Sequence, residues 1–328
     1  MHRTKVSCRV KGSAVTPTRR KVVDGEAMLT SDDLRLLAKL PISAIIAWLF
    51  PPRYWMPIGS MIVGLDRHSQ HQLSLRIGQI LGALSTPEQL QAVVRRHLTE
   101  IRLDQLAYLR SYAPGGWRPE LTLSGAEHLD TALARGAGVV LWIAPTVAAP
   151  LVAKMALHRH GTRAHHLSHP FHGLSSRTWL GRRVLNRLRT RVEDRYLAER
   201  VQLGRSNESF AALRRLAALL TQGRVVSVSV GRQGSRVAMA PFLDGRLHVA
   251  SGAPALAART GAALLPAMAW RTGPNAFTTR IYAPLTDVGD LDAVASAFAR
   301  ELATLALEHP DQIHWNHNSI QPTTSPAQ

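Results

Sequence analysis

The chain has 328 residues, 45% of them hydrophobic, so it can bury a sizeable core and is not a disordered or fibrous protein. Lys and Arg number 40 against 22 Asp and Glu, a formal charge of +18, which either favours an anionic partner or reflects an arginine-rich composition. The single cysteine, Cys8, excludes an internal disulfide and a thiolate metal cluster and indicates a reducing compartment.

The first residues are basic. Residues 2–21 carry seven Lys or Arg and no Asp or Glu, and no apolar run follows them as it would in a secretory signal. We therefore predict a disordered basic arm over residues 1–27, ahead of a better-patterned chain that begins at Met28.

The most apolar stretch is 36–65, which prolines interrupt at 41, 51, 52 and 57. The run 40–50, between Lys39 and Pro51, has only 11 residues, whereas a bilayer span needs about 20. Two short apolar segments with Trp48, Tyr54 and Trp55 at their junction suit the membrane interface, where amphipathic rings settle. We predict a helical, membrane-associating region over 28–115, with an ordinary buried helical hairpin as the alternative.

The next segments alternate between helical and extended patterns. A helix over 86–109 has Thr86 as N-cap and Pro87 at its first position. Later strands are predicted at 138–144, 164–168, 224–230, 236–240, 262–269 and 277–283, and helices at 147–159, 177–190, 206–222, 253–260 and 290–308. This alternation predicts an α/β core over 116–320, with a mixed, largely parallel sheet covered by helices on both faces and a tail at 321–328. Ligands of such sheets bind at the strand ends.

Five segments in order carry a family resemblance. They are Leu123-Ser124-Gly125-Ala126-Glu127-His128-Leu129 with the Ala-Leu-Ala-Arg-Gly run at 132–136 and Gly138-Val139-Val140-Leu141; Ala212-Leu213-Arg214-Arg215-Leu216; Pro241-Phe242-Leu243-Asp244-Gly245; the run 255–262; and Pro310-Asp311-Gln312 with Trp315 and His317. Together they resemble the bacterial lysophospholipid acyltransferase-like family of the lipid A biosynthesis lauroyl/myristoyl acyltransferase type. The resemblance covers about residues 30–320.

The resemblance implies a catalytic His-x4-Asp/Glu pair directly after the strand at 138–144, in which the carboxylate orients an imidazole that takes the proton of the acceptor hydroxyl. Here the two positions hold Pro145 and Pro150, and none of the 15 histidines has an Asp or Glu five residues later. The general-base dyad is therefore missing from the sequence.

Two hypotheses follow. In the first, the protein transfers a fatty acyl group from acyl carrier protein or acyl-CoA to a hydroxyl of a lipid or glycolipid acceptor with an atypical active site, and needs no metal or other cofactor. In the second, it is a catalytically lapsed relative that binds lipid or acyl carrier or assists a partner enzyme. Both imply a peripheral protein on the anionic cytoplasmic face of the inner membrane.

Histidines offer weak replacements for the missing base. His165, His166 and His169 belong to a histidine-rich segment without a nearby carboxylate or thiolate, and their spacing matches no standard metal-ligand pair. Three interpretations of these histidines stay open: a recruited base, a metal site, or surface and structural residues.

The turn 231–236 is a better candidate for substrate binding. Its glycines let main-chain amides approach an anion, while Arg232 and Arg236 suit phosphate and Gln233 matches the family pattern. A solvated hairpin is the alternative. Trp315 and His317 match the family ending and are predicted to contact substrate, although Asn318 and Ser319 replace the two arginines that follow in relatives.

A basic stretch lies at 177–191. Six arginines and Trp179 form a basic helix that is equally suited to an acidic acyl carrier protein or anionic lipid heads, and nucleic acid is the disfavoured partner.

Overall fold

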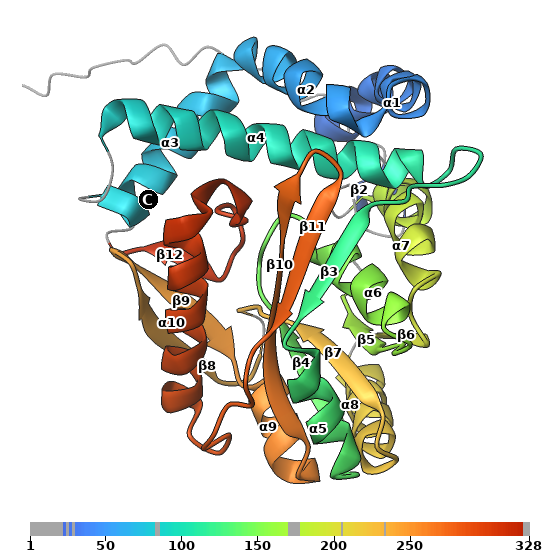
Figure 1. Cartoon of the computed structure of the whole chain (residues 1–328), viewed down its shortest axis with the longest axis vertical. Helices are drawn as coiled ribbons and strands as arrows, with labels where there is room; N and C mark the ends of the chain where they lie inside the picture. Colours follow the sequence, from blue (N-terminus) through green and yellow to red (C-terminus); the bar gives the residue numbers. More distant parts are fainter. Residues whose placement is uncertain are drawn as a thin grey trace, which may run out of the picture.

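The computed structural model of the chain describes residues 22–23, 26–27, 30–82, 86–169, 178–204, 206–232 and 234–323. Its first layer is helical (Figure 1). The elements are α1 (Ser31–Leu49), η1 (Pro52–Tyr54), α2 (Trp55–Gly64), α3 (Arg67–Leu81) and α4 (Pro87–Arg110). The helices α1, α2 and α3 all pack on α4. The arm predicted over 1–27 lies outside the described residues, apart from the paired strands β1 (Val22–Val23) and β2 (Glu26–Ala27).

Local sequence signals explain where these helices begin. Thr86 accepts a hydrogen bond from the Gln89 amide while the Gln89 side chain accepts from the Thr86 amide, a capping box that confirms the predicted start of α4. Thr30 and Asp33 form the same arrangement at the start of α1. Pro51 and Pro52 end α1 and begin η1, so the apolar stretch folds back on itself as a helical hairpin.

The core is a seven-stranded sheet in the order β3-β11-β10-β4-β7-β5-β6. Only the β10–β11 pair is antiparallel, which confirms the mixed, largely parallel sheet. The strands are β3 (Glu120–Ser124), β4 (Val139–Ile143), β5 (His165–Ser168), β6 (Glu199–Gln202), β7 (Val225–Ser229), β10 (Ala263–Gly273) and β11 (Ala276–Ile281). Every residue of β4 is buried, as expected of a central parallel strand.

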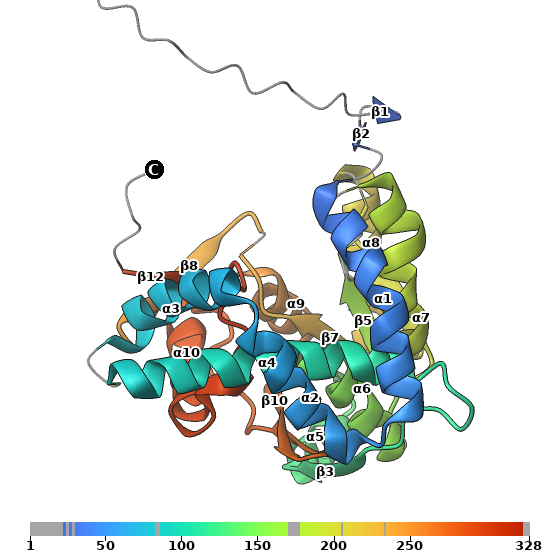
Figure 2. The ribbon, with the colours of Figure 1, turned by 90° about the horizontal axis from the view of Figure 1, so that it is seen from above.

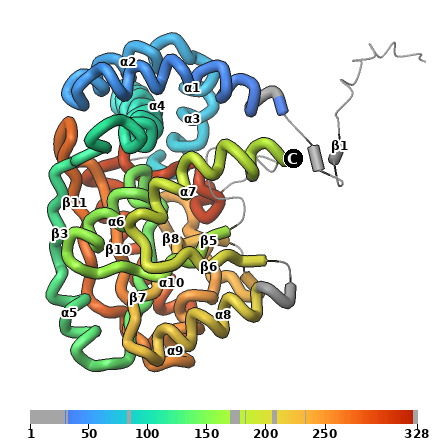
Figure 3. The backbone as a smooth tube through the Cα atoms, turned by 90° about the vertical axis from the view of Figure 1, so that its right-hand side faces the viewer, coloured from blue at the N-terminus to red at the C-terminus, as the bar shows by residue number. Residues whose placement is uncertain are grey.

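Two hydrophobic clusters cover the two faces of the sheet. One joins alternate residues of β4, such as Val140 and Trp142, to α8 (Ser206–Thr221), α9 (Gly252–Thr260) and α10 (Leu291–Glu308). The other joins Val139 and Leu141 to α5 (Ala126–Ala134), α6 (Ala149–Arg159) and α7 (Asn186–Asp194), which follows the π-turn η3 (Gly181–Leu185). Figure 3 shows α8 and α9 together at one end of the molecule, and α7 nearer the N-terminal helices.

A second, antiparallel sheet has the order β12-β9-β8, from β8 (Val237–Phe242), β9 (Gly245–Ala250) and β12 (Ile320–Pro322). It packs against α10, which leads through η4 (Pro310–Gln312) into the C-terminal segment. The strands flanking 231–236 therefore lie in different sheets, and the predicted alternative of a simple hairpin is wrong. The segment is a crossover beside the carboxyl end of β7.

No helix among the described residues is long and apolar enough to cross a membrane. Two of the predicted interfacial rings, Trp48 and Tyr54, are 47% and 45% exposed. Trp55 is 1% exposed and donates through its indole N–H to the Phe50 carbonyl at 2.9 Å, so its prediction as a membrane contact is wrong. Its ring packs into the core because it faces α4 rather than the outer side of α2.

Candidate active site

A cavity of about 400 Å3 lies at the carboxyl ends of β4, β7 and β5. Strand pairing brings these ends together, since Ile143 is aligned with Ser229 and Leu167 with Val228. The sheet edge where α/β proteins bind ligands is therefore hollow here. The lining residues are Trp142, His166, Leu167, Ser168, His169, Leu203, Leu213, Val228, Ser229, Val230, Gly231, Arg232, Ala250, Gly252, Ala253, Leu256, His317 and Asn318.

One wall of the cavity is apolar. Leu213 of α8, Leu256 of α9 and Val228 of β7 belong to the same face of the sheet. Trp142 forms part of this wall and is held by Phe298, whose ring centroid lies 4.6 Å from its own. This wall suits a hydrocarbon chain, because transfer of apolar surface out of water is favourable by about 25 cal/mol per Å2.

Other lining residues supply hydrogen-bond donors. Arg232 is exposed and lines the cavity, as do Gly252 and Ala253 in the first turn of α9. The first amides of a helix have no intrahelical acceptor and carry a partial positive charge, so they attract an anion or a polarised carbonyl. His248 lies close by, and its pKa is lowered by burial and by the charge of Arg232.

His317 has a defined proton position. Its Nδ1 lies 2.6 Å from the Ser319 hydroxyl and accepts from the Ser319 amide at 3.3 Å. Because an amide N–H only donates, a neutral His317 ring carries its proton on Nε2. Burial and the nearby His314 lower the pKa of His317 to about 4, so the ring is neutral at neutral pH. His317 is thus prepared to donate a hydrogen bond and poorly suited to take a proton.

The main chain at the two dyad positions is held by hydrogen bonds, and Pro150 is half-buried. Pro145 is buried, and its carbonyl accepts from the His314 amide at 2.8 Å. Thr146 pairs with Ile313 and donates its hydroxyl to the Ala269 carbonyl at 2.5 Å. The Pro150 carbonyl accepts from the Lys154 ammonium. Neither proline lines the 400 Å3 cavity.

The residues between these prolines line a small cavity. Val147 and Ala148 border a space of about 10 Å3 together with Glu100, Asp104 and Arg271. Such a volume holds one water at most. Among the described residues, the main chain around the two prolines therefore takes part in the packing of the fold, and neither position holds a group that transfers protons.

A buried polar layer lies beneath α4, on the side that faces the sheet. His97, Glu100, Asp104 and Tyr108 recur every three or four residues, which places them on one face of the helix. His97 Nδ1 lies 3.0 Å from the Asp311 carbonyl, Arg271 donates to Glu100 at 2.7 Å, and Arg189 pairs with Asp104. This layer was not predicted, although the spacing of its polar residues along α4 is visible in the sequence.

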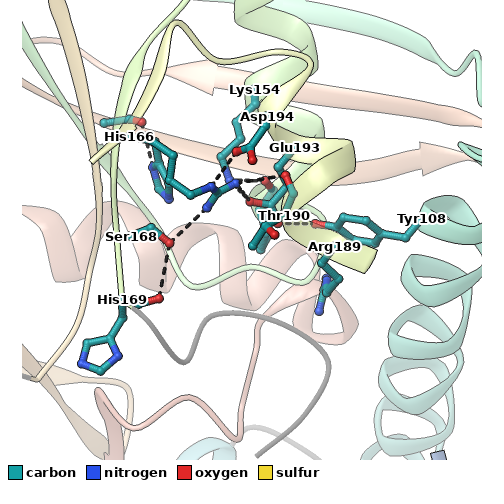
Figure 4. Close-up of polar contacts among 12 residues, drawn as sticks. Tyr108, Lys154, His166, Ser168, His169, Arg189, Thr190, Glu193 and Asp194 are labelled. Carbon is teal, nitrogen blue, oxygen red and sulfur yellow. Dashed lines mark hydrogen bonds and ion pairs between the residues drawn. The ribbon is translucent and has the colours of Figure 1, made fainter. Parts of the chain in front are cut away.

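Glu193 of α7 is the centre of this layer and is fully buried (Figure 4). It accepts from the Tyr108 hydroxyl at 2.8 Å, from Lys154 at 2.8 Å and from Arg200 at 2.9 Å. Arg200 also donates to Asp194 at 2.6 Å. Positive and negative groups therefore alternate, and the buried carboxylate has its charge balanced.

Burial shifts the pKa values of this layer. It raises the pKa of Asp104 to about 6 against the opposing charge of Arg189, and lowers the pKa of Lys154 against the opposing charge of Glu193. It also lowers the pKa of His97 to about 4, with His314 acting in the same direction. His97 and His314 are hence neutral at neutral pH, and their ring centroids lie 6.5 Å apart.

The predicted replacement bases lie apart from one another. His165 and His166 point to opposite faces of β5: His165 Nδ1 lies 3.2 Å from Glu199, and His166 Nδ1 lies 2.9 Å from the Ser227 hydroxyl on the neighbouring strand. His166 and His169 line the cavity and His165 does not, because it is the first residue of β5 and the cavity lies at the carboxyl end of that strand. No group of three metal-ligating side chains gathers among the described residues.

The predicted substrate contacts divide in the same way. Arg232 and His317 line the cavity, whereas Arg236 is exposed outside it, and Gln233 lies outside the described residues. Trp315 is fully buried and donates to the Pro310 carbonyl at 2.7 Å, so its prediction as a substrate contact is wrong. Its ring instead packs against Phe242 in the core.

Comparison with known families identifies the chain. The family model described as bacterial lipid A biosynthesis acyltransferase matches residues 101–321, about two thirds of the chain. No curated protein matches the chain. The match includes β4, both prolines, the cavity and the C-terminal segment with His317. The chain therefore belongs to the bacterial lipid A biosynthesis acyltransferase family.

Proposed function

We propose that this chain transfers a fatty acyl group from a thioester donor, acyl carrier protein or acyl-CoA, to a hydroxyl of a lipid or glycolipid acceptor. The reaction takes place in the 400 Å3 cavity and uses binding and polarisation of the reactants in place of a dyad. The observation that carries the proposal is one cavity lined both by donors, Arg232, His317 and the start of α9, and by apolar side chains.

The bonds and protons of this reaction balance without a base supplied by the protein. The acceptor oxygen attacks the thioester carbonyl carbon, the C–O bond forms, the C–S bond breaks, and the hydroxyl proton leaves on the departing sulfur as a thiol. The Nε2–H of His317 and the first amides of α9 are donors for the oxygen on which negative charge develops. Removal of one such donor in other enzymes slows catalysis by about 10²- to 10³-fold.

The basic helix α7, which lies beside α1 (Figure 2), fits the donor. Arg183, Arg187 and Arg191 are exposed and recur every four residues, so they form one cationic face along η3 and α7. Such a face attracts an acidic carrier protein and speeds its encounter. Charge reversal of these three arginines should raise the KM for acyl carrier protein much more than that for acyl-CoA.

A specific observation favours a second candidate. Because the main chain at Pro145 and Pro150 is tied to His314 and Lys154, the chain could have kept ligand binding and lost turnover. It would then be a lipid- or acyl-carrier-binding accessory protein.

One assay separates the two functions. Purified protein is incubated with radiolabelled acyl carrier protein and a membrane extract, beside a Pro145→His, Pro150→Glu double variant. Labelled lipid from the wild-type protein, reduced in an Arg232→Gln variant, supports transfer in the cavity. Labelled lipid from the double variant alone supports the accessory protein. Binding of acyl carrier without labelled lipid from either protein also contradicts transfer.

A further inference from the structure

One buried serine connects the polar layer around Glu193 to the cavity. Ser168 is the last residue of β5, is 3% exposed and lines the 400 Å3 cavity. Its hydroxyl oxygen accepts a hydrogen bond from Arg200 Nη1 at 3.0 Å (Figure 4). Ser229 ends the neighbouring strand β7 and lines the same cavity, but no arginine donates to it among the residues that the structure describes. The two serines therefore differ in the charged donor that only Ser168 has.

Arg200 is held in place by carboxylates on its other side. Its side chain is 7% exposed, and it donates through Nη2 to Glu193 at 2.9 Å and through Nε to Asp194 at 2.6 Å. Glu193 is itself held by the Lys154 ammonium at 2.8 Å. Because a guanidinium is planar and rigid, two bound nitrogens fix the direction of the third. The buried polar layer therefore fixes the bond from Arg200 to Ser168.

The hydroxyl proton of Ser168 is available to a ligand. Because a guanidinium only donates, the Ser168 oxygen is the acceptor in its bond with Arg200, and its own O–H points elsewhere. Among the described residues, its acceptor is the His169 carbonyl at 3.4 Å, which is long for a hydrogen bond between two oxygens. A ligand oxygen at an ordinary distance in the cavity would therefore form a better bond with this hydroxyl.

The surroundings of Ser168 suit a carbonyl oxygen. The positive charge of Arg200 is balanced by Glu193 and Asp194, so the serine offers a polar group and little net charge. A hydroxyl whose oxygen accepts from a cation is polarised and donates more strongly, and its low exposure limits competition by water. A carbonyl oxygen that gains negative charge during a reaction is stabilised most by such a donor.

We propose that the Ser168 hydroxyl donates a hydrogen bond to the thioester carbonyl of the bound acyl donor, and that Arg200 is the positioning residue that orients this hydroxyl. The proposal rests on the proposed function for the choice of ligand, a fatty acyl thioester. Ser168 joins His317 and the first amides of α9, which line the same cavity. The buried polar layer thus contributes to the cavity through one serine, although the dyad positions hold prolines.

Two analogues of the acyl donor isolate this hydrogen bond. In the ketone analogue a CH2 group replaces the thioester sulfur and the carbonyl stays, whereas the S-alkyl thioether analogue lacks the carbonyl. Each is prepared on coenzyme A and on acyl carrier protein, and its binding is measured by calorimetry. Ser168→Ala should weaken binding of the ketone by about threefold to tenfold, the value of one hydrogen bond, and leave binding of the thioether unchanged.

Two further variants separate the hydroxyl from its position in the cavity. Ser168→Thr keeps the hydroxyl and should restore most of the ketone binding. Ser229→Ala removes a hydroxyl from the end of the neighbouring strand and is the matched control, because no arginine donates to Ser229 among the described residues. It should leave the preference for the ketone over the thioether unchanged.

Arg200→Lys tests the positioning. A lysine keeps a positive charge for Glu193, but its single nitrogen cannot replace the separate donors to Glu193 and Ser168. It should weaken ketone binding by about threefold where Ser168 is present and cause no further loss in a Ser168→Ala background. A merely structural effect of Arg200→Lys would be the same in both backgrounds.

Three results would overturn the proposal: equal loss of ketone and thioether binding in Ser168→Ala, unchanged ketone binding in that variant, or no binding of either analogue to the wild-type protein. The acyl-transfer assay tests the proposed function separately. Carbonyl-dependent binding without labelled lipid contradicts transfer and leaves the hydrogen bond in place. Labelled lipid from the wild-type protein, with normal ketone binding by Ser168→Ala, contradicts the hydrogen bond alone.

Discussion

The segment 145–150 and the neighbouring cavity use the same sheet edge in different ways. In 145–150 the main chain is paired with 312–314 and with Lys154, and Val147 and Ala148 line a cavity of about 10 Å3. In the cavity, of about 400 Å3, Arg232, His317 and the start of α9 border open space. Loss of a proton-handling pair therefore need not close an active site, because binding groups on other elements can remain.

The largest expected effect comes from a variant in the buried polar layer, which lies beside the prolines and contrasts with the open cavity. Glu193→Ala leaves Lys154 and Arg200 buried without their shared carboxylate, which should lower the free energy of unfolding by about 3–5 kcal/mol in urea titrations. The control is Glu199→Ala, whose partner Arg215 is half-exposed, with an expected loss below about 1 kcal/mol. Equal losses would show that the layer is no more important to stability than a surface ion pair.

His317 sharpens the account of the cavity. His317→Met removes the donor and should lower kcat by about 10²-fold, while His317→Gln keeps an N–H donor and should recover much of the loss. Steady-state kinetics over pH 6 to 8 should show no step due to His317, because its pKa is about 4. A step near pH 6.5 that His317→Gln abolishes would identify the ring as a base instead.

The pH dependence of stability tests whether His97 is buried in its neutral form. Its pKa is about 4 in the folded protein and 6.5 when unfolded, so between these values the unfolded chain binds a proton that the folded chain does not. The folded state therefore loses stability as pH falls, by about 2 kcal/mol from pH 7.5 to pH 4.5. Urea midpoints of wild type and His97→Gln should converge over this range. A constant difference would contradict a neutral, buried His97.

The smallest expected effect comes from the two arginines of 231–236, one of which lines the cavity while the other lies outside it. Arg232→Gln should raise the KM for the lipid acceptor by about tenfold, the value of one charge-assisted hydrogen bond, and Arg236→Gln should leave it unchanged. The Arg236 variant is the matched control, because the residue is exposed and lies outside the cavity. Equal effects would place the acceptor over the whole turn.

Much of the fold was predictable from hydrophobic periodicity and from the residues that begin and end helices. Thr86 and Pro87 located the start of α4, the helices predicted at 206–222 and 253–260 became α8 and α9, and the apolar run after Gly138 became β4. The short strands β3, β6 and β9 were missed, because half-exposed edge strands and a small antiparallel sheet carry a weaker apolar signal. The crossover at 231–236 was invisible because pairing between distant strands decides it.

The candidate site was less accessible to sequence reasoning. The prolines at 145 and 150 showed that the catalytic dyad is missing, and Arg232 and His317 were predicted to contact substrate. Trp315 and Trp55 were misassigned, since a tryptophan pattern cannot distinguish an exposed ring from one packed in the core. The proton position of His317 depends on Ser319 and the local turn, which only the folded chain brings together.

Photolabelling tests most directly whether the ligand site lies in the cavity and not at the prolines. An acyl carrier protein loaded with a photoreactive fatty acyl chain is irradiated with the wild-type protein, and labelled peptides are mapped by mass spectrometry. We predict label on the cavity walls, in peptides that contain Val228, Leu213 or Leu256, and competition by unlabelled acyl donor. Label concentrated on residues 145–152 would contradict the account.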